Sequence, residues 1–152
     1  MKKTLFTISL ILGTLASSYS QISEDYQLKQ ASKASYNWFK NINSANYPAA
    51  WEDLSIEVQN NFNKEDWLIG INRMMNSFGE FSGRKEVSRE FKSSLEVKDL
   101  PDGYYAIFQY ESNYKYTLNH SEQLILHQDH KQKWRVLDYS YDFNPGEGFI
   151  EE

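Results

Sequence analysis

The segment 100–110 reads LPDGYYAIFQY, and it decides how the second half of the chain folds. Asp102-Gly103 is a dipeptide that supports a tight chain reversal. The aromatic-rich run from Tyr104 to about Tyr116 follows it and favours a strand. Before it, apolar and polar residues alternate with a period of two, which predicts a long strand with one face made of Val87, Arg89, Phe91, Ser93, Leu95 and Val97. The segment therefore joins two antiparallel strands.

Two further strands are expected downstream. One runs from Glu122 to about Gln128, and the other runs from Trp134 to about Tyr141. The polar run 130–133 separates them as a turn. The four strands would form an antiparallel meander.

The region before the strands has helical periodicity. Apolar or small residues recur every three or four positions from Asp25 to about Ile42, which predicts a first helix. Pro48 can open a short second helix, from Ala49 to about Val58. A third is expected from Lys64 to Phe78, with Asn63 as its N-cap and Gly79 ending it.

Three helices followed by four strands predict an α+β fold, in which the helices pack on a curved antiparallel sheet. We expect the sheet to curve enough to give a cone-like shape with a pocket. Residues 21–142 form a single domain in this interpretation. Residues 143–152, which include Pro145 and two glycines, are expected to be a flexible C-terminal tail.

Residues 1–20 have the form of a secretory signal peptide. Lys2 and Lys3 precede an apolar run, and the small residues Ser18 and Ser20 precede a cleavage site before Gln21. A cut after Ser18 also fits. The apolar run has about a dozen residues, short of the ~20 that a spanning helix needs. We therefore expect export to the periplasm or the medium, and no membrane span after cleavage.

The composition excludes several classes of function. The chain has no cysteine, so disulfides, thiolate metal sites and a cysteine nucleophile are excluded. Its net charge of −5 argues against a nucleic-acid partner. Neither a glycine-rich phosphate loop nor a serine nucleophile elbow occurs, so we expect no cofactor and, on balance, no enzyme.

Several short motifs recur in a characteristic order along the chain. They are Ala50-Trp51, Trp67, Arg73, Gly79, Arg84, the run 100–105, Ser112, Tyr114, Glu122, Leu124, Leu126, the run 134–136 and Tyr139. Together they resemble the exported bacterial family called domain of unknown function 4019. The resemblance implies a secreted or periplasmic protein without an assigned reaction, and a fold similar to the cone of nuclear transport factor 2. Members usually carry glycine where this chain has Asp138.

Arg73, Arg84 and Glu122 are the first candidates for a site. The two arginines could lie at a pocket mouth and bind a carboxylate or phosphate ligand through their planar guanidinium groups. Alternatively, one of them pairs with Glu122 and holds the third helix to the sheet, which is the commoner use of such residues. If Glu122 were buried without a partner, its raised pKa would suit a general base.

Aromatic residues supply the remaining candidates. Trp67 lies on the buried face of the third helix, and Tyr104, Tyr110, Tyr114 and Tyr116 would share one face of a regular strand. A wall of tyrosines suits a sugar or an aromatic ligand. Alternatively, these tyrosines form an ordinary packing ladder between strands, and we favour that interpretation.

The three histidines offer a weak metal hypothesis. His127 and His130, with Asp129 or Glu122, could bind zinc, and His120 precedes the same strand. Residues three apart on a strand point to opposite faces, so we expect solvated histidines at a hairpin and no metal site.

Three functions are consistent with these patterns. The first is a non-catalytic exported module that binds a small molecule or a protein partner, with Trp67, Arg73, Arg84, Tyr104, Tyr110 and Glu122 as pocket candidates and no catalytic residue. The second is a pocket enzyme with Glu122 or Asp138 as general base. The third is a homodimer that buries the outer face of the sheet.

Overall fold

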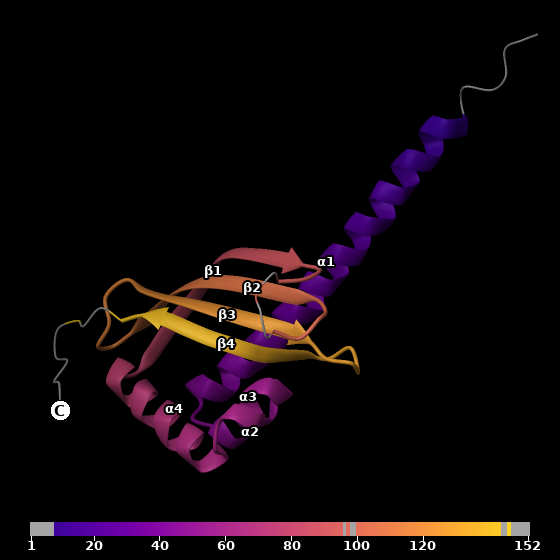
Figure 1. Cartoon of the computed structure of the whole chain (residues 1–152). Helices are drawn as coiled ribbons and strands as arrows, with labels where there is room; N and C mark the ends of the chain where they lie inside the picture. Colours follow the sequence, from indigo (N-terminus) through magenta and orange to yellow (C-terminus); the bar gives the residue numbers. More distant parts are fainter. Residues whose placement is uncertain (1–7, 96, 98–99, 144–145, 147–152) are drawn as a thin grey trace, which may run out of the picture.

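Four antiparallel strands form one sheet in chain order (Figure 1). The computed structural model describes residues 8–95, 97, 100–143 and 146, with side chains from Glu24 onward. The strands are β1 (Phe81–Lys92), β2 (Tyr105–Tyr114), β3 (His120–Gln128) and β4 (Trp134–Asp142). This meander and the helices before it confirm the α+β class. The expected C-terminal tail lies outside the described residues, apart from Phe143 and Gly146.

The helices are α1 (Ile8–Asn43), α2 (Tyr47–Glu52), α3 (Ile56–Asn61) and α4 (Lys64–Phe78). Both predicted ends of α4 are confirmed. The Asn63 side chain accepts hydrogen bonds from the Glu65 and Asp66 amides, and Gly79 ends the helix with φ 80°. α1 begins well before the predicted start and includes much of the expected signal segment, and its N-terminal part extends away from the sheet (Figure 1). Within the described residues, no helix is both long and apolar enough to cross a membrane.

The predicted second helix is two helices, because the chain between them pairs with the sheet. Leu54 forms a parallel bridge with Val136 of β4. The Ser55 amide donates to the Val136 carbonyl oxygen at 2.8 Å, and the Val136 amide donates to the carbonyl of Asp53 at 2.9 Å. The Ser55 hydroxyl then caps α3 by accepting from Val58 N. A continuous helix through these residues would lose the bonds to β4.

β1 starts and ends earlier than predicted. Phe81 pairs with Tyr114, so the strand begins before Val87 and includes Arg84. The register shifts between Glu86 and Ser88, and Val87 is the extra residue of this bulge. A bulge changes which side chains face inward. The predicted face of odd-numbered residues is therefore wrong at Val87, whose side chain is 55% exposed.

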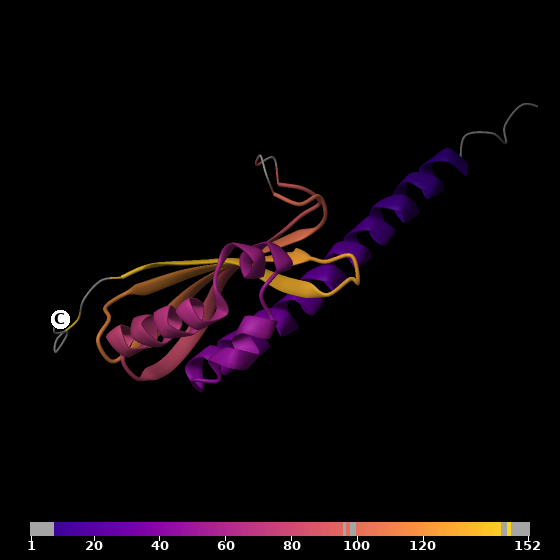
Figure 2. The same cartoon turned by 60° about the horizontal axis from the view of Figure 1, so that its bottom comes forward.

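The helices cover one face of the sheet, which we call the inner face. Figure 2 shows α1 and α4 on the same side of the strands. Phe39 of α1 packs edge-on against Tyr110, and Phe78 of α4 packs against Tyr114, with ring centroids 5.2 Å apart in each pair. The buried core between the layers includes Trp38, Phe108, Leu124, Leu126 and Val136. The inner face is thus where the side chains of the helices and the sheet meet.

Candidate functional site

The buried carboxylate of Glu122 is the most elaborate polar feature of the inner face. Its residue is 1% exposed. Arg84 Nε donates to Oε2 at 2.7 Å, and Arg84 Nη2 donates to Oε1 at 3.0 Å. The Ser112 hydroxyl also donates to Oε2. The hydroxyls of Tyr139 and Tyr114 donate to Oε1 at 2.7 and 3.0 Å. We call these five residues the Glu122 network.

The network keeps Glu122 ionised. Burial alone raises the pKa of this carboxyl, but the hydrogen bonds and positive charge of Arg84, with the bonds from Ser112 and Tyr139, outweigh it and hold the pKa below its usual value. Burial and the neighbouring carboxylate raise the pKa of Tyr139 and Tyr114. In the stable charge state of the network, Glu122 is an anion, Arg84 is a cation, and the phenols of Tyr114 and Tyr139 are neutral.

This geometry argues against Glu122 as a general base. Its two oxygens already accept hydrogen bonds from four side chains, and a lowered pKa is the opposite of what a base working near neutral pH needs. Asp138, the other proposed base, is exposed on β4 next to Leu137, the extra residue of a second bulge. It is not part of the Glu122 network.

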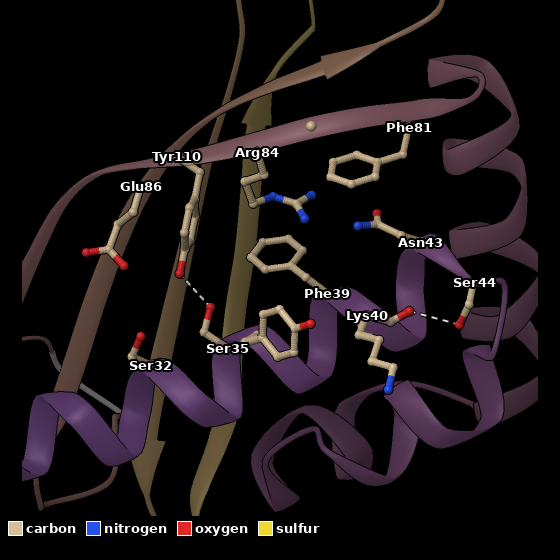
Figure 3. A pocket seen from close by; sticks show the side chains of 12 residues that line it. Ser32, Ser35, Phe39, Lys40, Asn43, Ser44, Phe81, Arg84, Glu86 and Tyr110 are labelled. Carbon is tan, nitrogen blue, oxygen red and sulfur yellow. Dashed lines mark hydrogen bonds between the residues drawn. The ribbon is translucent and has the colours of Figure 1, made fainter.

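An open groove of about 610 Å³ lies next to this network, between α1 and the first two strands (Figure 3). Helix α1 supplies one wall, with Ser32, Ser35, Tyr36, Phe39, Lys40 and Asn43, and Ser44 directly follows the helix. The strands supply the other, with Phe81, Arg84, Glu86 and Tyr110. The groove is therefore lined by aromatic rings, by small polar groups and by the charged side chains of Lys40, Arg84 and Glu86.

Arg84 connects the groove to the Glu122 network. Its guanidinium lies 3.5 Å from the ring centroid of Phe39 and 5.0 Å from that of Phe81, so it takes part in cation–π contacts as well as the ion pair. Beside it, the hydroxyls of Tyr110 and Ser35 are 2.6 Å apart and share a hydrogen bond. Burial raises the pKa of Tyr110 to about 12, so this phenol stays neutral. An ion pair, cation–π contacts and a hydrogen bond therefore hold the side chains at the centre of this wall.

The structure does not bring the six predicted pocket residues together. Arg84 and Tyr110 line the groove, with Glu122 behind them. Trp67 lines a different cavity, near α4. Arg73 is exposed on α4. Tyr104 lies outside β2, is 43% exposed and packs against Phe91.

The ion pair between an arginine and Glu122 is confirmed, with one change. The arginine is Arg84 of β1, so the pair joins two strands across β2 and does not hold a helix to the sheet. Of the four tyrosines expected on one face, Tyr110 and Tyr114 are buried on the inner face. Tyr104 and Tyr116 lie outside the bounds of β2.

The expectation of solvated histidines is wrong for two of the three. His120 is fully buried against Phe78 and Tyr114, and His127 is 6% exposed and packs against Tyr105. Only His130 is exposed. In the part of the chain that the structure describes, no three potential metal ligands come together.

Sequence patterns missed Ser35, Phe39 and Tyr139 as site residues. Ser35 and Phe39 belong to the apolar stripe of the first helix, where they were assigned only to packing. Tyr139 and Ser112 were visible only through the family resemblance.

A family model described as "Protein of unknown function (DUF4019)" matches residues 34–139. The chain belongs to this family.

The matched range of DUF4019 contains every member of the Glu122 network. It also contains all the residues that line the groove except Ser32. Neither the curated proteins nor the solved structures gave a match. The family description assigns no reaction or ligand.

Proposed function

We propose that this DUF4019 chain is an exported, non-catalytic binding module, and that its groove between α1 and β1 takes a small planar anion. The observation that carries this proposal is the groove itself. It is large enough for a small organic molecule, since ligand pockets typically measure roughly 300–1,000 Å³. Its neighbouring carboxylate is neutralised and fully hydrogen-bonded, which suits a structural support and not a catalytic base.

The rings of the groove favour a flat, largely apolar ligand. Phe39 and Phe81 stand on opposite walls, and Figure 3 shows the Asn43 amide turned toward the space between them. Asn43 Oδ1 is buried and has no hydrogen-bond partner among the described residues.

The charges of the groove favour an acidic group on that ligand. Glu86 is paired with Arg89, and Glu122 is paired with Arg84, so both carboxylates are neutralised. Lys40 is exposed on the α1 wall and carries a further positive charge. A planar aromatic acid, such as 4-hydroxybenzoate, matches these features.

An NMR titration of the full chain with 4-hydroxybenzoate tests the proposal. We expect amide shifts confined to α1 residues 32–44 and to β1, and weaker binding in Lys40→Gln. Lys33→Gln is the matched control, because Lys33 is exposed on the same helix and does not line the groove. If neither this acid nor a panel of related aromatic acids moves these signals, the proposal is wrong.

The export part of the proposal rests on residues 1–20 and has its own test. The intact mass of the protein from an exporting bacterial host should correspond to a chain that starts at or near Gln21. Recovery of the chain only inside the cell, with Met1 to Ser20 still attached, would contradict it.

A further inference from the structure

A second cavity, separate from the groove, lies where α3 and α4 approach β4. It measures about 400 Å³, and its wall is mainly apolar. The apolar residues that line it include Leu54, Val58, Ile71, Met74 and Val136. We call it the α4 cavity. It shares no lining residue with the groove, so it is a separate candidate site.

Two carboxylates from different elements lie at the α4 cavity. Asp66 of α4 and Asp138 of β4 line it, and both are exposed. Neither is paired with a lysine or an arginine among the described residues. No basic side chain is among the described residues that line the cavity. The charge at the cavity is therefore negative, which repels an anion and attracts a cation.

Aromatic rings at the same cavity also suit a positive charge. Trp67 is half-buried and packs edge-on against Trp51, and Phe62 is 58% exposed. Both Trp67 and Phe62 line the cavity. The faces of such rings are negative and attract ammonium groups. Within the described part of the chain, no lysine or arginine lies over either ring, so the protein's own cations do not use them.

Gly70 contributes open space to the α4 cavity. It lies in the middle of α4, where glycine is a poor helix residue, and it is among the residues that line the cavity. A Cβ at this position would meet nothing within 4 Å, and the backbone is helical. Neither crowding nor backbone conformation therefore requires glycine here. Space beside the cavity is what the missing side chain provides.

We infer that the α4 cavity binds an organic cation, in which an ammonium group is carried by an apolar body. The apolar body would pack against Ile71, Met74 and Val136, and the ammonium group would lie on the exposed side, near Asp66 and Asp138. A bare metal ion would leave the apolar wall unused, whereas an apolar amine uses both the wall and the charges. Binding here is independent of the groove and of the anion proposed for it.

An NMR titration of the full chain with 2-phenylethylamine tests the inference. This alkyl amine is protonated near neutral pH, as the lysine side chain is. The neutral match is 2-phenylethanol, and the anionic match is 3-phenylpropionate. We expect the amine to shift the amide signals of residues 66–74 and 136–139 and the indole N–H of Trp67. The alcohol should bind about tenfold more weakly, since it loses the attraction of both carboxylates, and the acid should leave these signals unmoved.

Two variants test the role of the carboxylates. Asp66→Asn and Asp138→Asn should each weaken amine binding about three- to fivefold, the loss expected for one partly exposed ion pair. Glu65→Gln is the matched control, because Glu65 is exposed in the same first turn of α4 and does not line the cavity. It should bind the amine within about twofold of the wild type, since its charge is screened by solvent and salt.

Three results would overturn the inference. The first is equal binding of the alcohol and the amine, and the second is amine shifts confined to another part of the chain. The third is unchanged amine binding in both Asp66→Asn and Asp138→Asn. All of these substitutions are at exposed positions, so the folded variants can be compared directly.

Discussion

Arg84 on β1 and Glu122 on β3 form an ion pair across the intervening strand, with Arg84 Nε 2.7 Å from Glu122 Oε2. The side chains of both residues are nearly removed from solvent, at 9% and 0% exposed. A buried charge is tolerated only when it is paired and hydrogen-bonded. Here the remaining lone pairs of the carboxylate are satisfied by Ser112, Tyr114 and Tyr139. The pair therefore links β1 to β3 across β2, and Tyr139 connects β4 to the same carboxylate.

Removing the charge of Glu122 should destabilise the fold strongly. Glu122→Gln leaves Arg84 buried without a counter-ion, and breaking such a pair costs about 3–5 kcal/mol. The free energy of unfolding in urea measures this loss. Glu111→Gln, at an exposed position of β2, is the control and should change it by no more than about 0.5 kcal/mol. A loss below about 1 kcal/mol for Glu122→Gln would mean that the pair contributes little.

His120 should make the fold sensitive to mild acid. Burial lowers the pKa of this imidazole from 6.5, and the positive charge of Arg84 lowers it further. The negative charges of Glu122 and Asp142 raise the pKa, but by less. Glu122 Oε1 lies 3.8 Å from His120 Nε2. A histidine whose pKa is lower in the folded state stabilises the fold above pH 6.5 and loses that contribution as the pH falls.

The variant His120→Phe tests this dependence. The ring is packed among Phe78, Tyr114 and Tyr141, and neither of its nitrogens has a hydrogen-bond partner in the described part of the chain, so phenylalanine should fit. We compare the free energy of unfolding between pH 6.5 and pH 4.5, which is the ordinary pKa of glutamate. Over this range the variant should lose less stability than the wild type. Parallel curves over this range would show that His120 is not the responsible group.

Alanine substitutions at two glycines on or beside α4 should change the stability of the fold in opposite directions. Gly79 has φ 80°, and a Cβ there would lie 2.6 Å from Tyr116 Cδ2, so Gly79→Ala should cost about 1–3 kcal/mol. Gly70 has open space and lies inside the helix, so Gly70→Ala should stabilise by about 0.5–1 kcal/mol. Thermal unfolding of both variants measures the difference, and equal melting temperatures would contradict the assigned backbone roles.

Local patterns were sufficient for α4 and for three of the four strands. The 3.6-residue period, with Asn63 and Gly79 as caps, predicted both ends of α4 correctly. It did so because the capping residues and the apolar stripe indicate the same boundaries. The period of two found three of the four strands within a few residues. It failed on β1, since the bulge at Val87 is set by pairing with β2 and leaves no mark in the local alternation.

The candidate site depended on long-range contacts that no local pattern contains. Opposite charge was enough to suggest an arginine for Glu122, but only the pairing of β1 brings Arg84 to it while leaving Arg73 exposed. Likewise, Trp67 and Tyr110 line different cavities because α4 and α1 cover different parts of the sheet. His120 looked like a solvated turn residue, and it is buried because the aromatic rings of Phe78 and Tyr141 close over it.

The carboxyl carbon of Glu122, followed by NMR during a pH titration of the intact chain, tests most directly whether the network is structural. The described geometry predicts a pKa below the ordinary value of 4.5, because the bonds from Arg84 and its neighbours outweigh burial. A carboxyl that takes up its proton near neutral pH would contradict this account and would restore Glu122 as a candidate general base.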